Sequence, residues 1–305
     1  MLNDEEIEKL VRAGRIAAEA RELGASLVKP GASAREICEE VESYIIRKGA
    51  SPAFPCNFSV NEVAAHYTPG IDDDVRVPNV AIVKIDVGAS VDGYLSDTAA
   101  SVVVGSSELQ ALADSARAAL DAARSVMAPG VRIFDIGRQI ESAIKSMGFK
   151  PVRNLTGHTI ARYTLHAGLS IPNYADRSLM WKRLGPGTVV AVEPFSTSGK
   201  GLVVDGPRAF IYSATGRRPK GLSEGAAGLL DFVLKRYSTL PFAVRWLASE
   251  WSPADLERYL DELIRFRALV SYPVLIEAAR APVAQFEHTF VILKDKVIVT
   301  TETSS

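Results

Sequence analysis

The chain has few of the features that would place it among secreted or membrane proteins. Its 305 residues include only two cysteines, Cys38 and Cys56, which is too few for a disulfide framework and favours a reducing compartment. No apolar run approaches the length of about 18 residues that a membrane-spanning helix needs. The N-terminus is acidic and polar, unlike that of a secretory signal peptide. We therefore expect a soluble, cytoplasmic protein.

The chain also lacks an excess of charge of either sign. Its 35 Lys and Arg residues are balanced by 36 Asp and Glu residues, and no extended basic stripe is present. Binding to a phosphate backbone depends on positive charge, so we expect no nucleic acid binding by this chain alone. The hydrophobic content of 47% is typical of a globular protein with a substantial core.

Helix and strand patterns come in blocks rather than in regular βαβ alternation. This order predicts an α+β fold with a mostly antiparallel sheet. Residues 51–58 are rich in proline and are expected to form a loop. Helices are predicted over 4–27, from a capping box at 33–36 to about Arg47, over 107–127 and over 134–147, and strands near 157–165, 188–195, 208–213, 285–293 and 296–302.

Residues 216–272 differ in character from the rest of the chain. Helical patterns dominate them at 222–236 and 253–267, and the second begins at an N-cap serine followed by proline. Strand patterns resume only after Pro282. We therefore predict one domain over residues 1–305, interrupted by a helical insertion at 216–272.

Residues 83–98 carry the most informative pattern, two apolar strands that each contain an aspartate and are joined by a Gly- and Asp-containing turn. If the turn centres on 91–92, Asp86 lies directly opposite Asp97; if it is 92–93, the two are diagonal neighbours on one face. Only an odd-length loop would separate them. Facing carboxylates repel each other, and a divalent cation would remove the repulsion. The alternative is that each aspartate only marks a strand end.

Three more titratable residues lie in strand-like apolar sequence: His158, Glu193 and Glu287. Taken singly, the histidine is explained as a satisfied core residue and each glutamate as the partner of a buried arginine. Together with the two aspartates they supply four negative charges and a neutral imidazole, which two divalent cations would balance. Such mixed ligands suit Mn, Fe, Co or Zn. A dinuclear site of this kind hydrolyses acyl or phosphoryl bonds.

The order of these five residues resembles that of the metal ligands of methionine aminopeptidases, which have the pita-bread fold. The surrounding strings are similar too: FPCNFSVNEVAAHYTP at 54–69, KIDVG at 84–88, GHTIARYTLHAG at 157–168 and APVAQFEHTF at 281–290. The long stretch between Glu193 and Glu287 resembles the type 2 subfamily, and the compact N-terminus resembles archaeal members. The resemblance covers essentially the whole chain. It implies an α+β creatinase/aminopeptidase fold, in which a pseudo-twofold, mostly antiparallel sheet is flanked by helices.

The resemblance also implies a role for each residue of the site. The metal ligands, which would bind two divalent ions (Co, Mn, Fe or Zn), are Asp86, Asp97, His158, Glu193 and Glu287. Glu193 would also act as the general base. His166 would hydrogen-bond the scissile carbonyl and the oxyanion, and His66 would lie near the scissile nitrogen. The pocket for the methionine side chain would include Phe54, Leu165, Phe195 and Tyr272.

The implied activity is removal of the initiator methionine from nascent proteins whose second residue is small. The implied partner is the N-terminus of the nascent chain, including at the ribosome, and the implied state is a monomer without membrane contact. Two alternatives stay open. One is an X-Pro dipeptidase related to prolidase, and the other is a binding protein of the same fold without catalysis.

Overall fold

The computed structural model describes residues 2–73 and 75–302. All strand pairs among the named strands of these residues are antiparallel, as the sequence predicts. One sheet has the order β1 (Ser51–Val60), β3 (Ala81–Val91), β4 (Tyr94–Val104) and another the order β11 (Phe242–Ala243), β10 (Val203–Ala214), β12 (Leu269–Glu277), β2 (Val63–Ala65). The other two are β13 (Val283–Gln285), β9 (Phe195–Thr197), β5 (Lys150–Pro151) and β15 (Val297–Val299), β14 (His288–Ile292), β8 (Val189–Val192), β6 (Thr156–Ile160), β7 (Ser170–Pro172).

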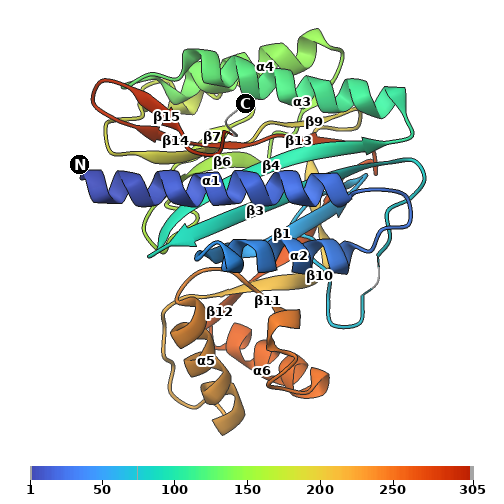
Figure 1. The fold of residues 1–305 in the computed structure, drawn as a ribbon, viewed down its shortest axis with the longest axis vertical. Coiled ribbons are helices and arrows are strands. Elements are labelled where there is room, and N and C mark those ends of the chain that lie inside the picture. The colour runs from blue at the N-terminus through green and yellow to red at the C-terminus, as the bar shows by residue number, and fades with distance from the viewer. Residues whose placement is uncertain (1, 74, 303–305) are drawn as a thin grey trace.

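Two pairs of helices cover the sheets, and a third pair lies at one end of the molecule (Figure 1). The pairs are α1 (Asp4–Leu27) with α2 (Ala34–Arg47), α3 (Ser107–Val126) with α4 (Ile133–Ser146), and α5 (Glu224–Tyr237) with α6 (Pro253–Arg265). The first pair buries its apolar face on β1 and β3, and the second packs on strands that include β8 and β14. These helices therefore cover the outer faces of the sheet that contains β3 and of the sheet that contains β8, and they exclude solvent from both.

The helix predictions for the first half of the chain are confirmed to within one or two residues. Asn3 and Glu6 form a reciprocal capping box at the start of α1, and the Ser33 side chain accepts the Glu36 N–H at the start of α2. Ser252 caps α6, with Pro253 in its first turn. None of the helices in the described ranges combines the length and the apolar character that crossing a bilayer requires.

The predicted loop at 51–58 is wrong, because these residues form strand β1. β1 lies at the edge of its sheet, and its register against β3 shifts between Pro52 and Phe54 and again between Phe54 and Asn57. Proline has no N–H to donate, so it is tolerated at edges and bulges. The prolines that suggested a loop thus mark an irregular edge strand.

The prediction that strands resume only after Pro282 is also wrong, because β12 begins at Leu269 and pairs along much of β10. Its Pro273 lies opposite Ala209 at a break in register. Because of this proline, the sequence of β12 did not show a regular strand pattern. The helices α5 and α6 share an apolar cluster with the ends of these strands. We call α5, α6 and the segment between them the α5–α6 unit.

Two strands that the sequence predicts as continuous are each broken at a glutamate. The strand predicted at 188–195 is split into β8 and β9, and Glu193 lies in the gap. The strand predicted at 285–293 is split into β13 and β14, and Glu287 lies in that gap. Since β8 pairs with β14 and β9 pairs with β13, the two breaks lie side by side. A pair of broken strands therefore presents two carboxylates at one place.

Candidate metal centre

The hairpin of β3 and β4 has its turn at Asp92 and Gly93, since Val91 pairs with Tyr94. Both turn residues have positive φ, 52° and 83°, as a two-residue type I′ turn requires. Asp86 then pairs with Ala99, and Asp97 pairs with Gly88. Of the two registers that the sequence allowed, the structure has the one that makes the aspartates diagonal neighbours on one face.

Backbone contacts hold Glu287 against the strand that carries Asp97. The Glu287 N–H donates to Ala99 O at 3.0 Å, and Thr98 Oγ1 donates to Glu287 O at 2.8 Å. Thr289 Oγ1 donates to Asp97 O at 2.7 Å. These bonds join β4 to the break between β13 and β14, so they fix the relative position of the two carboxylates.

The five residues predicted as metal ligands converge on one point. Ligand atoms of Asp97, His158 and Glu287 all lie within 4.8 Å of one another. His158 Nε2 is 3.7 Å from Glu193 Oε1. Gln285 Nε2 links the remaining aspartate, because it lies 3.5 Å from Asp86 Oδ2 and 3.4 Å from Glu287 Oε2. Only the position of Gln285, two residues before Glu287, indicated that it would lie there.

The carboxylate oxygens of this cluster fit a bound cation. Asp86 Oδ1, Asp97 Oδ1 and Glu287 Oε1 are all buried, and none has a hydrogen-bond partner in the part of the chain that the structure describes. A buried carboxylate oxygen without a partner is strongly unfavourable. Oxygen ligands with one imidazole are a donor set for a divalent transition metal ion.

The raised pKa values of these carboxyl groups also indicate that a positive charge among them would be favourable. Burial, followed by the neighbouring carboxylates, raises the pKa of Asp86, Glu193 and Glu287 well above the usual range. Burial raises the pKa of Asp97 to about 7. A cation among them would reverse these shifts, because it favours the ionised forms.

His158 can bind a cation through an uncharged ring. Burial lowers its pKa to about 4, so the imidazole is neutral at neutral pH. Its Nδ1 lies 3.4 Å from Thr159 O, which leaves Nε2 facing Asp97 at 3.4 Å. The preceding Gly157 is required by packing, since a Cβ there would lie 2.3 Å from Ala191 O of the paired strand β8.

Asp86, Asp97 and Glu193 border a cavity of about 110 Å³. Its lining residues are Phe54, Asn57, Ala65, His66, Asp86, Asp97, Thr156, His158, Leu165, His166, Glu193, Ile211, Pro241 and Tyr272. Both histidines that sequence analysis assigned to substrate contacts line this cavity, as do Phe54, Leu165 and Tyr272. Phe195 is not among the lining residues; it is 1% exposed and lies in an apolar cluster that includes Ala65.

The two cavity histidines approach from irregular backbone. His66 has φ of 64°, and its Nδ1 lies 3.2 Å from Pro273 O. Since a carbonyl only accepts, this contact places the proton on Nδ1 and leaves Nε2 as an acceptor. The His166 ring lies 4.3 Å from the His158 ring between centroids. The Tyr272 ring lies 5.7 Å from that of His66.

Sequence reasoning did not assign Asn57, Ala65, Ile211 or Pro241 to the site. Asn57 gave a usable signal, because asparagine is depleted in strands, and here it pairs with Asp86 across β1 and β3. Ile211 and Pro241 gave none. They reach the cavity only because β10 and the segment before β11 fold beside it.

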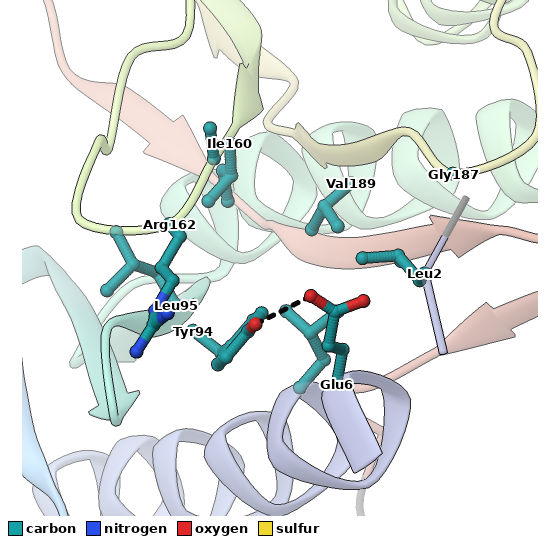
Figure 2. Close-up of a pocket in the computed structure, with 10 residues that line it drawn as sticks. Leu2, Glu6, Tyr94, Leu95, Ile160, Arg162, Gly187 and Val189 are labelled. Carbon is teal, nitrogen blue, oxygen red and sulfur yellow. Dashed lines mark hydrogen bonds between the residues drawn. The ribbon is translucent and has the colours of Figure 1, made fainter. Parts of the chain in front are cut away.

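A second cavity, of about 300 Å³, lies between the start of α1 and the turn after β6 (Figure 2). Its floor includes Leu10, Leu95, Ile160 and Val189, which belong to the same apolar cluster as Phe54 and Leu165 of the smaller cavity. Tyr94 donates to Glu6 Oε1 at 2.7 Å. Among its described lining residues there is one carboxylate and no histidine, so the chemistry lies in the smaller cavity.

Comparison with known proteins agrees with this geometry. Residues 8–292 match the model of metallopeptidase family M24. The chain belongs to this metallopeptidase family. It is 45% identical over 302 residues to a methionine aminopeptidase of Saccharolobus solfataricus, covering 99% of each chain. It is 46% identical over 297 residues to one of Pyrococcus abyssi, covering 97% of this chain and 100% of that one.

Solved structures show the fold. The structure of a thermophilic Arx1 superposes with a TM-score of 0.85 at 18% identity, covering 100% of this chain and 92% of that one. The predicted α+β pita-bread fold is confirmed. Family membership and the cluster of Asp97, His158 and Glu287 together support the use of a divalent metal by this metallopeptidase.

Proposed function

We propose that this chain is a methionine aminopeptidase that removes the N-terminal methionine from proteins whose second residue is small. One observation carries the proposal. Asp86, Asp97, Glu193 and three histidines, which lie far apart in the sequence, border one small cavity with apolar walls, and Glu287 lies beside Asp97 and His158. Two relatives with this name are 45% and 46% identical over nearly the whole chain.

Two divalent ions, of Co, Mn, Fe or Zn, would be held by Asp86, Asp97, His158, Glu193 and Glu287, as implied by the resemblance. The four carboxylates would balance their charge when ionised. When bound, such ions supply Lewis-acid polarisation of the scissile carbonyl and a water of lowered pKa.

Glu193 is suited to proton transfer because it lies at a strand break beside the ligand cluster and lines the cavity. It would take the proton of the attacking water and deliver it to the nitrogen of the leaving amine as the peptide bond breaks. His166 would hydrogen-bond the oxygen that becomes negative. His66 would face the leaving side, with Nε2 free to accept a hydrogen bond.

The apolar part of the cavity would receive the methionine side chain. Phe54 and Leu165 lie on the side of the core, and Ile211, Pro241 and Tyr272 lie on the side of β10, β11 and β12. Phe195 would support Ala65 from behind. The partners would be N-termini of nascent chains in the cytoplasm, met by a monomeric enzyme, with residues 216–272 as a helical insertion of the type 2 kind.

The test is release of the first residue from short peptides by protein that has been dialysed against EDTA and then loaded with Mn²⁺ or Co²⁺. We expect rapid release of methionine from Met-Gly-Ser and slow release from Met-Leu-Ser. Faster cleavage of X-Pro dipeptides would favour a prolidase-like activity. Binding of metal without turnover of any peptide would favour a binding protein.

A further inference from the structure

His66 has a backbone conformation that needs outside support. It has φ of 64°, in the left-handed region that residues other than glycine rarely adopt. Strain of this kind persists only where the surrounding structure fixes it, and it is concentrated at functional sites. The contact of its ring with Pro273 O fixes the side chain but leaves the following backbone to be held by other groups.

The segment after His66 is held by hydrogen bonds to β1. Phe58 N donates to Tyr67 O at 2.8 Å, and Thr68 Oγ1 donates to Cys56 O at 2.8 Å. Thr68 and Pro69 are buried. These bonds come from an edge strand with two register shifts, so β1 itself needs a partner on this side.

Arg245 provides a second hold on the same segment, from the α5–α6 unit. It lies in the short helix η2 (Val244–Leu247) and is only 9% exposed. Its Nη1 donates to Thr68 Oγ1 at 2.8 Å and lies 3.5 Å from Pro69 O. Its Nη2 forms an ion pair with Glu42 of α2.

Glu42 connects this arginine to β1. One of its oxygens accepts the Cys56 N–H at 3.0 Å, and the other accepts Trp246 Nε1 at 2.8 Å. Glu42 is 6% exposed, so the pair is almost completely removed from water. A buried ion pair is an inefficient way to stabilise a fold, because desolvation opposes the attraction. Its directional hydrogen bonds, by contrast, fix three segments relative to one another.

We propose that the buried Glu42–Arg245 pair positions His66 for the reaction by holding residues 66–69 between β1 and the α5–α6 unit. The effect on turnover rests on the proposed function. The effect on His66 itself does not. The planar guanidinium matters because two of its nitrogens bind different partners, the Glu42 carboxylate and Thr68, at fixed geometry.

The decisive variant is the double substitution Glu42→Gln with Arg245→Met. It removes both charges together and so avoids leaving one buried and unpaired. We expect it to fold and to bind Mn²⁺ with unchanged affinity in calorimetry, while kcat for Met-Gly-Ser falls by about ten- to a hundredfold. The Hε1 proton resonance of His66, assigned through His66→Asn among the four histidines, should shift in the metal-free protein.

Arg245→Lys separates positioning from simple stabilisation. Lysine keeps a cation beside Glu42 but cannot bind the carboxylate and Thr68 in the fixed geometry of a fork. We expect most of the Tm to be retained while kcat and the His66 resonance stay perturbed. The control is Leu260→Ala, which weakens the apolar cluster of the α5–α6 unit without touching residues 66–69. It should lower Tm and leave both readouts unchanged.

Wild-type kcat and an unshifted His66 resonance in the double variant would overturn the proposal. Full recovery of both readouts in Arg245→Lys would reduce the pair to a stabilising contact and also overturn it. If the wild-type protein releases no methionine, the proposed function fails. The resonance in the metal-free protein then still decides whether the pair positions His66.

Discussion

The two sides of the cavity are built in different ways. The carboxylate side rests on paired strands, since Asp86 and Asp97 belong to one regular hairpin and Glu287 is bonded to β4 through its backbone. The opposite side comes from irregular backbone, where His66 has positive φ and β10 is paired with β12 across register shifts. Ladder hydrogen bonds give these carboxylates a fixed spacing. Irregular segments can instead be shaped around a substrate by separate contacts.

The largest effect should come from the carboxylate side. Glu287→Gln removes a charge but keeps the shape of the side chain, so we expect kcat to fall by more than about 10³-fold and Mn²⁺ affinity to weaken sharply. Tm in EDTA should not fall, because one of several mutually repelling buried carboxylates is gone. Calorimetry and peptide release provide the measurement. Asp92→Asn, at the turn of the same hairpin, is the control, and full activity in Glu287→Gln would exclude a ligand role.

On the irregular side, His166→Ala should affect turnover but not metal binding. Loss of one donor to the oxyanion lowers kcat by about 10²- to 10³-fold, while the Kd for Mn²⁺ stays as in the wild type. Arg162 lies in the same loop but lines the larger cavity of Figure 2, so Arg162→Ala serves as the matched control. A change in Kd equal to that of Glu287→Gln would show that the two sides are not separate in function.

Gly157 tests how closely the strands β6 and β8 must approach each other on the carboxylate side. Gly157→Ala places a Cβ 2.3 Å from Ala191 O, so β6 or β8 must move. We expect a loss of about 1–3 kcal/mol in the free energy of unfolding, measured by urea titration, together with weaker Mn²⁺ binding. Gly185→Ala has open space around the new Cβ and should change the free energy by less than about 0.5 kcal/mol. Equal effects in both variants would contradict the close approach of the strands.

The smallest expected effect is the change with pH in the stability of the metal-free protein. Burial raises the pKa of Asp97 to about 7 and raises those of Asp86, Glu193 and Glu287 well above the usual range, so the native state binds more protons than the unfolded state. Stability should therefore fall as pH rises. Burial lowers the pKa of His66 and His158 to about 4, which acts in the opposite direction but only below about pH 6.5.

Burial also lowers the pKa of Lys84 to about 7, which opposes the fall above that pH. The useful range is therefore from about pH 6.5 to about pH 7.5, where Asp97 loses its proton in the native state. We expect Tm in EDTA to fall over this range, and the fall to be much smaller with saturating Mn²⁺. Differential scanning calorimetry gives both curves. A flat curve in EDTA would mean that the carboxylates are already ionised in the native state.

Local sequence was a reliable guide where one segment decides its own structure. The helices of the first half follow from capping residues and apolar spacing, and the hairpin of residues 83–98 follows from its turn. The same reasoning failed at β1 and β12, where proline weakens the strand pattern and pairing with a neighbour restores it. It also joined β8 to β9 and β13 to β14, because periodicity does not register a break that moves a strand from one sheet to another.

The sequence by itself determined which residues are available to bind a metal and in which order they occur, and it limited Asp86 and Asp97 to one face for any two-residue turn. Only the tertiary structure decided that Glu193 and Glu287 lie at adjacent strand breaks, that Phe195 packs in an apolar cluster rather than in the cavity lining, that Ile211 and Pro241 line the cavity, and that Arg245 binds the segment after His66. The physical reason is the sequence separation of the contacts involved. Turns and helices are determined by residues that are neighbours in the chain. A cavity is determined by contacts between segments that are distant in sequence, and the positions of those segments depend on the packing of the whole domain.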